Sequence, residues 1–292
     1  MQAAVRARVD AHPVAAFFVL AYVISWLGFL PTVVDADGGF GGLNLLLAQF
    51  GPAIAGVLVL RYTGGSIREL IERIVRWRVP LRWWIATLAI PVGVFGATSI
   101  AFALLGYEPE LSRLPDPLLT FLPTLVGLSL LAGLGEEPGW RGVALPRLQE
   151  RYGPLGATVL LGVVWAGWHL PVYFVDPRSS HGITDPIVLG GMVALTALGI
   201  VLYAFFYTWI YNRTGSILLL MVLHGGFNTS TVHLIPFADA VVFGPAYVTL
   251  LTVQVGVLFV TVLGLVALSG GRLGYDRGAR RQPSIEDATP AE

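Results

Sequence analysis

Long apolar runs without charged residues follow one another along most of this chain of 292 residues. A run of about 20 apolar residues is long enough to cross the hydrocarbon core of a bilayer as a helix. None of the runs alternates with a period of two residues, so the strands of a membrane β-barrel are not indicated. The pattern predicts about eight transmembrane helices, at residues 14–34, 43–60, 83–107, 117–135, 154–175, 186–211, 216–235 and 246–269.

The composition agrees with an all-α polytopic membrane protein whose partner is the lipid bilayer. Hydrophobic residues make up 55% of the chain and charged residues only 12%, whereas a soluble domain carries about 25% charged residues. The formal net charge of zero argues against nucleic acid as a partner. The chain has no cysteine and no lysine, so the sequence excludes disulfides, thiol catalysis and serine–lysine dyads.

The arginines indicate how the helices are oriented. All but two of them, Arg113 and Arg178, lie in the segments that would share one side of the membrane. By the positive-inside rule, this bias predicts a multi-pass protein of the cell (cytoplasmic) membrane with both termini in the cytoplasm. We therefore expect a cytoplasmic N-terminus at 1–13, a transmembrane domain at 14–269 and a polar, disordered cytoplasmic tail at 270–292. The charged, periodic segment 61–82 predicts an amphipathic helix on the cytoplasmic face.

Ionisable residues at membrane depth are informative in such a protein, because each is costly there unless it is paired or functional. Glu136, Glu137 and Arg141 follow the fourth apolar run, and three charges in six residues are also typical of a cytoplasmic loop. If the helix continues to Leu148, Glu136 lies about 18 Å from its end, and Pro138 would kink the helix. Arg141 can pair with Glu137, four residues earlier on the same helix, so we expect it to give structural support.

Two histidines lie on later apolar runs at a comparable depth. His169 lies about 22 Å along the fifth run and His224 about 12 Å along the seventh. His224 and Asn228 are four residues apart and share one helix face. A lone histidine and a His–Asn pair are also compatible with structural hydrogen bonds between helices. Together with the two glutamates, these residues predict a buried polar cavity that serves as the active site.

Such a set of side chains suits the activation of water. A glutamate can take a proton from water with the help of a histidine, and the remaining donors can bind the oxyanion of a tetrahedral intermediate. The same set could instead bind zinc or another divalent metal through His169, His224 and Glu137, with Glu136 as the base. The sequence leaves the metal-free and the metal-assisted mechanism open. It contains no His-Glu-x-x-His, no Gly-x-Ser-Gly and no aspartate inside the apolar runs, which excludes three other classes of intramembrane protease.

Three short blocks on separate apolar runs resemble the CPBP family, which groups CAAX-prenyl endopeptidases with bacteriocin-processing and bacteriocin-immunity proteins and is also called Abi. The family's blocks are EExxxR, FxxxH and HxxxN or HxxxD, and the resemblance covers about 117–235. Trp165 stands where the family usually has phenylalanine, and we expect it to be structural support. The corresponding blocks here are Glu136-Glu137-x-x-x-Arg141, Trp165-x-x-x-His169 and His224-x-x-x-Asn228.

The resemblance implies a fold of eight helices, an intramembrane metalloendopeptidase and a catalytic role for five residues. Glu136 would be the catalytic base, and His169 would assist the activation of water. His224 and Asn228 would bind the oxyanion or a metal, and Glu137 would orient neighbouring groups. The substrate would be a peptide or a membrane protein.

The leading hypothesis is therefore a CAAX-protease-type intramembrane endopeptidase that hydrolyses a peptide bond near the cytoplasmic side of the membrane. The alternative is a non-proteolytic membrane protein, such as a bacteriocin self-immunity protein or a scaffold. A transporter with a carboxylate–histidine proton relay is a third hypothesis, which the lack of internal repeats weakens.

Overall fold

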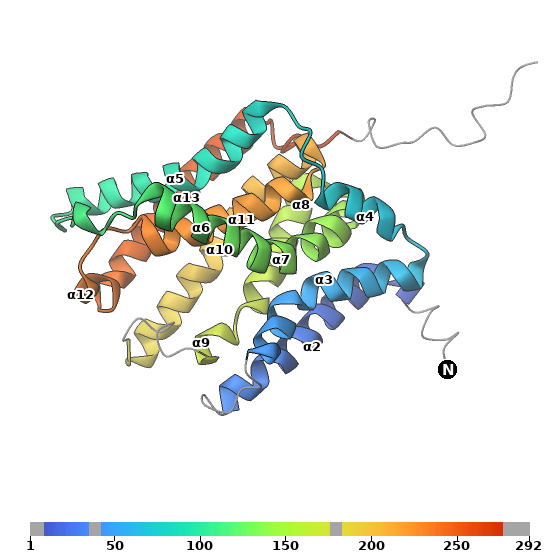
Figure 1. The fold of residues 1–292 in the computed structure, drawn as a ribbon, viewed down its shortest axis with the longest axis horizontal. Helices are drawn as coiled ribbons and strands as arrows, with labels where there is room; N and C mark the ends of the chain where they lie inside the picture. Colours follow the sequence, from blue (N-terminus) through green and yellow to red (C-terminus); the bar gives the residue numbers. More distant parts are fainter. Residues whose placement is uncertain (1–8, 35–41, 176–182, 277–292) are drawn as a thin grey trace, which may run out of the picture.

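The computed structural model describes residues 9–34, 42–175 and 183–276, and within these ranges it contains helices and turns but no strand (Figure 1). The prediction of an all-α polytopic membrane protein is confirmed. The longer helices are α2 (Pro13–Val34), α3 (Leu43–Thr63), α5 (Leu81–Leu104), α8 (Leu145–Trp168), α10 (Pro186–Thr214), α11 (Ile217–His233) and α13 (Ala246–Leu268). The shorter elements are α4 (Ile67–Ile74), η1 (Leu111–Arg113), η2 (Pro117–Phe121), α6 (Leu122–Leu128), η3 (Ser129–Gly133), α7 (Leu134–Gly139), η4 (Trp140–Ala144), α9 (Val172–Val175) and α12 (Asp239–Val242).

Six helical stretches of the described residues are long and apolar enough to cross a membrane: Pro13–Val34, Leu43–Thr63, Leu81–Leu104, Pro117–Trp168, Pro186–Thr214 and Ala246–Leu268. The predicted fourth and fifth spans fall together in Pro117–Trp168, whose 52 residues would measure about 78 Å as one straight helix. Gly153 divides this stretch, because its backbone is not helical (φ 69°, ψ 176°). The predicted seventh span is α11, which has only 17 residues. The predicted eight transmembrane helices are therefore reached only if each half of the stretch Pro117–Trp168 crosses the membrane and α11 crosses it as well.

The helices form two groups around a central set (Figure 1). α2 and α3 pack against each other on one side, and α3 also packs against α7. α5 and α13 lie on the opposite side, where α5 packs against α11 and α13 against α10. α8 packs against α10 in between. This arrangement brings α3, α7, α8 and α11, which are far apart in the sequence, into one region of the core.

The fourth apolar run continues as a helix through Leu148, as the depth argument required. Its middle part, α7, carries both glutamates and Pro138 and is buried from Gly135 to Gly139. Pro138 has no N–H to donate to the preceding turn, and wide π-type turns, η3 and η4, lie on either side of α7. Such turns occur frequently at functional sites.

Small residues let α3 and α7 approach each other closely. A Cβ atom added to Gly135 would lie 2.6 Å from the carbonyl oxygen of Gln49, and one added to Gly139 would lie 2.2 Å from that of Pro52. Both distances are too short for a side chain, so the two backbones are in direct contact. Glycines spaced by four residues are a common device for such contacts between membrane helices.

The fifth apolar run ends earlier than predicted. α8 stops at Trp168, and the short helix α9 begins only at Val172. Pro171 explains the break, because it has no N–H and disfavours helical backbone in the residue before it. His169 consequently lies at the C-terminal cap of α8 rather than in the middle of a helix.

The arginines of segment 61–82 lie near one end of the bundle. The amphipathic helix predicted over 61–82 is shorter in the structure: α4 spans Ile67–Ile74, with Leu70 buried and Arg68 exposed, whereas 61–63 belong to α3 and 81–82 to α5. Arg73 donates to the carbonyl oxygen of Gly142 (3.3 Å) and to the hydroxyl of Tyr211 (3.1 Å). Arg113 lies beside α12, where it pairs with Asp239 at 2.8 Å, near the other end of the bundle (Figure 1). This separation agrees with the arginine bias in the sequence.

The predicted tail begins at 270, but residues 270–276 are part of the folded structure. Leu273 is fully buried in the core, and its carbonyl oxygen accepts a hydrogen bond from Asn212 Nδ2 at 3.1 Å. The burial of the apolar Leu273 side chain stabilises this segment, although most of its neighbours in the sequence are polar. The predicted disorder of 277–292, most of the predicted N-terminus (1–8) and Arg178 lie outside the described residues.

Candidate active site

Glu136 is buried (2% exposed), and both of its carboxylate oxygens accept hydrogen bonds from neighbouring helices. Oε1 accepts from Gln49 Nε2 of α3 at 2.8 Å. Oε2 accepts from the indole Nε1 of Trp165 of α8 at 2.6 Å. A carboxylate with this burial and these partners belongs to the interior of the bundle, so the cytoplasmic-loop interpretation of this segment is wrong.

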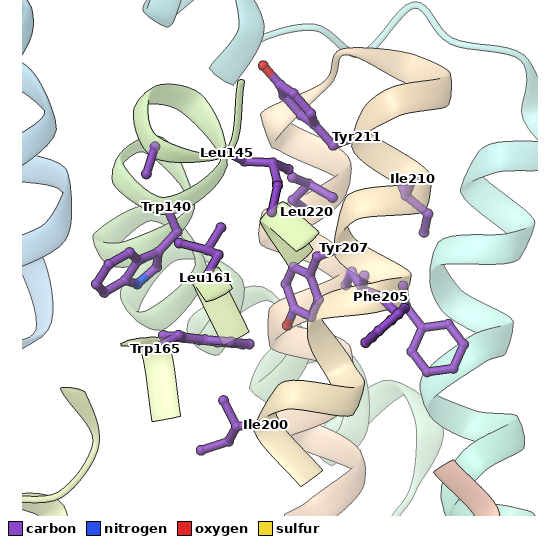
Figure 2. Close-up of a cluster of buried hydrophobic side chains, with 14 of the residues drawn as sticks. Trp140, Leu145, Leu161, Trp165, Ile200, Phe205, Tyr207, Ile210, Tyr211 and Leu220 are labelled. Carbon is purple, nitrogen blue, oxygen red and sulfur yellow. The ribbon is translucent and has the colours of Figure 1, made fainter. Parts of the chain in front are cut away.

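Glu137 is also buried and forms the predicted ion pair with Arg141 on the next helical turn. Arg141 Nη1 lies 3.2 Å from each of the two carboxylate oxygens. The guanidinium is fully buried against two aromatic rings, 4.2 Å from the ring centre of Trp165 and 4.3 Å from that of Tyr207. Figure 2 shows these two rings next to each other in the hydrophobic core. Cation–π contacts with both rings compensate part of the cost of burying the charge.

His224 lies between the two glutamates. Its Nδ1 is 2.8 Å from Glu137 Oε1, and its Nε2 is 3.7 Å from Glu136 Oε1. Because an ionised carboxylate only accepts hydrogen bonds, the nitrogen that faces Glu137 carries a proton. This hydrogen bond fixes the orientation of the imidazole and directs Nε2 towards Glu136.

His169 lies beside this cluster at the end of α8. Its Nδ1 is 2.8 Å from the carbonyl oxygen of Trp165, which can only accept, so Nδ1 carries the proton and Nε2 is the acceptor of the neutral ring. The ring centres of His169 and Trp165 are 5.6 Å apart. His169 also borders a cavity of about 230 Å³, whose other lining residues are Val172, Tyr173, Met192, Thr196, Ile200 and Tyr247.

Asn228 is the predicted site residue with the weakest connection to the cluster. It lies one helical turn after His224 on α11 and is half-buried. Within the described part of the chain it forms no hydrogen bond with the glutamates or histidines of the site. The structure thus brings Glu136, Glu137, Arg141, Trp165 and His224 into one network, with His169 adjacent and Asn228 one turn away.

Two residues of the network, Gln49 and Tyr207, were missed by the sequence reasoning. Gln49 is a polar side chain inside the apolar run 43–60. The rule that singled out the glutamates, that polar groups at membrane depth need a reason, would have found it. Tyr207 gave no comparable signal, because aromatic residues are common in such runs.

The residues offered as metal ligands do not fit a zinc centre in this arrangement. A zinc site needs at least three side chains aimed at one point, and no such group of histidine, aspartate, glutamate and cysteine occurs among the described residues. The Glu137 carboxylate is already bound by the Arg141 guanidinium, a cation that stands where a metal held by this carboxylate would have to bind. Two of these residues, Glu137 and His224, instead form a hydrogen-bonded carboxylate–imidazole pair, with Glu137 Oε1 2.8 Å from His224 Nδ1.

The fold and the site together define a helical membrane protein with a buried carboxylate–histidine centre. Residues 117–230 match the family described as Type II CAAX prenyl endopeptidase Rce1-like. CAAX prenyl protease 2 of Methanococcus maripaludis is 30% identical to this chain over 151 residues, which cover 50% of this chain and 49% of that protein. The chain thus spans about half the length of the curated relative it matches, and its residues 117–230 are similar to the type II CAAX prenyl endopeptidase family.

Proposed function

We propose that the chain is an intramembrane endopeptidase of the CAAX protease type, in which Glu136 activates the water that hydrolyses the peptide bond. The observation that carries this proposal is the buried Glu136 carboxylate, with His224 Nε2 at 3.7 Å from Oε1. A hydrogen-bonded carboxylate next to an imidazole is a suitable general base for water. The match of residues 117–230 to CAAX prenyl endopeptidases supports the same reaction.

The charges of the network favour a doubly protonated His224 in this mechanism. Glu136 and Glu137 carry two negative charges, and Arg141 compensates one of them. A proton on His224 Nε2, in addition to that on Nδ1, would balance the second charge within a buried cluster. The imidazolium could then donate from Nε2 to an oxyanion that forms beside Glu136.

The reaction follows from these positions. Glu136 takes a proton from water, and the water oxygen forms a bond with the carbonyl carbon of the peptide. The negative charge on the resulting tetrahedral oxyanion is stabilised by the N–H of His224. The carbon–nitrogen bond then breaks, and the proton held by Glu136 passes to the leaving amine. Every step uses groups of this chain, and no metal enters the sequence of steps.

His169 supports the same step, and its ring lies next to that of Trp165, with 5.6 Å between the ring centres. With Nδ1–H bound to the backbone, the lone pair of Nε2 can accept a hydrogen bond from the water or from the substrate amide. The cavity that His169 lines can accommodate a side chain of the peptide substrate. Asn228, one helical turn after His224 on α11, is proposed as a second donor to the oxyanion.

The cleavage site is proposed to lie near the cytoplasmic side. His224 lies seven residues after the start of α11, so it is about 10 Å along the helix from its first residue. That end of α11 adjoins segment 61–82, because Ser216 Oγ donates to the carbonyl oxygen of Arg76 at 2.7 Å. Under the positive-inside rule this arginine-rich end faces the cytoplasm.

The test compares the membrane peptidomes of cells that lack the protein and express either the wild type or Glu136→Gln at equal levels. We expect new peptide termini only with the wild type. Glu150→Gln is the matched control, because Glu150 is exposed and lies on the same long helical stretch. Identical peptidomes for the wild type and Glu136→Gln would contradict the proposal and favour a non-proteolytic immunity or scaffold function.

A further inference from the structure

We propose that Gln49 and Trp165 act together as a donor clamp: they are positioning residues that hold the two oxygens of the Glu136 carboxylate in the orientation that the reaction needs. This inference rests on the proposed function of Glu136. It assigns a role to α3, which lies outside the segment matched by the family. It also gives a reason for the tryptophan at position 165, where the family's block has phenylalanine.

Both donors of the clamp are at hydrogen-bonding distance from a buried charge. Gln49 Nε2 is 2.8 Å from Oε1, and Trp165 Nε1 is 2.6 Å from Oε2. Hydrogen bonds to an ionised group are short and about twice as strong as neutral ones. With one donor on each oxygen, the carboxylate cannot rotate about its last bond without losing both contacts. The remaining lone pairs of the carboxylate therefore keep a fixed direction for the water.

Trp165 is itself held rigidly, so its N–H is a well-placed donor. Arg141 lies over the face of its ring at 4.2 Å, and the ring of Tyr207 meets it edge-on at 5.4 Å. Arg141 binds Glu137, Glu137 binds His224, and His224 faces Glu136. Trp165 thus closes a ring of contacts that starts and ends at Glu136. A phenylalanine would keep the aromatic face for Arg141 but would leave Oε2 without this donor.

Gln49 is positioned by the close contact between α3 and α7. The carbonyl oxygen of Gln49 would lie 2.6 Å from a Cβ atom on Gly135, the residue directly before Glu136. Only glycine allows the two backbones to approach this far, and the Gln49 side chain then reaches the carboxylate from the neighbouring helix. The contact brings a residue from the first part of the chain into a site whose other members lie between 136 and 224.

A positioning role predicts a loss of turnover rather than a loss of substrate binding. Neither side chain needs to touch the substrate, so KM is expected to stay within about twofold of the wild-type value. Removing one charge-assisted hydrogen bond corresponds to about a 10-fold to 100-fold lower kcat. The site retains Glu136 and its partners, so activity is reduced and not abolished.

The experiment measures kcat and KM for Trp165→Phe and Gln49→Met, with a peptide that the wild type is found to cleave in membranes. The matched controls are Trp140→Phe and Gln254→Met. Trp140 is fully buried, and its indole nitrogen has no hydrogen-bond partner among the described residues; Figure 2 shows it in the same hydrophobic cluster as Trp165. Gln254 is buried too, but it donates to Tyr203 instead of a carboxylate (2.8 Å).

We expect both clamp variants to lose kcat as stated and both controls to stay within about threefold of the wild type. Because the loss of a donor to the buried Glu136 carboxylate also lowers the melting temperature, kcat is measured well below the melting temperature of every variant. Ultraviolet resonance Raman spectra provide a readout without substrate. The indole N–H band that Trp165→Phe removes should report a strong hydrogen bond in the wild type and a weaker one in Glu136→Gln.

The possible outcomes separate this inference from the proposed function. If Glu136→Gln abolishes cleavage while the clamp variants behave like their controls, the clamp is refuted and the proposed function stands. A rise in KM at unchanged kcat, or a Raman band insensitive to Glu136→Gln, also refutes the clamp. If the wild type cleaves no membrane peptide, the proposed function falls and this inference falls with it.

Discussion

The buried pair of Glu137 and Arg141 allows a quantitative prediction about stability. Arg141→Met keeps much of the side-chain volume but leaves the Glu137 carboxylate buried without its cation. Removing one partner of a buried ion pair costs about 3–5 kcal/mol, and the two cation–π contacts with Trp165 and Tyr207 are lost as well. Because methionine still packs against both rings, we expect a total loss of about 4 kcal/mol. For a protein of this size this is roughly an 8 °C lower melting temperature.

The assay is thermal unfolding of the purified protein in one detergent, followed by circular dichroism, for the single variant and for Arg141→Met/Glu137→Gln. In the double variant no charge is left without a partner, and the amide oxygen at 137 can still accept from His224 Nδ1. We expect it to recover most of the loss. A single variant that melts within about 1 °C of the wild type, or a double variant no more stable than the single one, would refute the reasoning.

Three further predictions concern packing, the C-terminal segment and metal. Gly139→Ala places a Cβ atom 2.2 Å from the Pro52 carbonyl oxygen and is expected to destabilise by about 1–3 kcal/mol. Gly93→Ala, which meets no atom within 4 Å, should be neutral in the same melting assay, and equal effects of the two would argue against the close contact of α3 and α7. Leu273→Ala should cost about 2–5 kcal/mol and expose residues 270–276 to limited proteolysis; unchanged protease resistance would speak against the packing of Leu273. EDTA and 1,10-phenanthroline are expected to leave cleavage unaffected in a peptide assay, whereas inhibition that added zinc reverses would show a metal-dependent reaction.

The helical runs could be predicted from the sequence because hydropathy over about 20 residues is a strong, local signal. Their ends were less predictable, since they depend on single residues. Pro171 ends α8 seven residues before the predicted limit of the span, and Gly153 divides the long stretch that begins at Pro117. The burial of Leu273 was not visible in the sequence, because it depends on a place in the core that other helices provide.

The charged residues of the candidate site could be predicted from the sequence, but the residues that they contact could not. The spacing of Glu137 and Arg141 by four residues predicted their pairing, which the structure confirms. The hydrogen bond between Trp165 and Glu136 depends on how α8 faces α7, and Gln49 reaches the site only because Gly135 and Gly139 allow α3 to approach. Contacts of this kind between distant segments leave no periodic pattern in a single sequence.

The measurement that tests the central claim most directly is kcat of the purified protein and of Glu136→Gln on one cleaved peptide, in the same detergent or liposome. Glutamine keeps the shape of the side chain but cannot take a proton from water. The account predicts a loss of kcat of about 100-fold to 10,000-fold, measured at a temperature at which circular dichroism shows both proteins to be folded. A correctly folded Glu136→Gln that cleaves the peptide within a few-fold of the wild-type rate would contradict it.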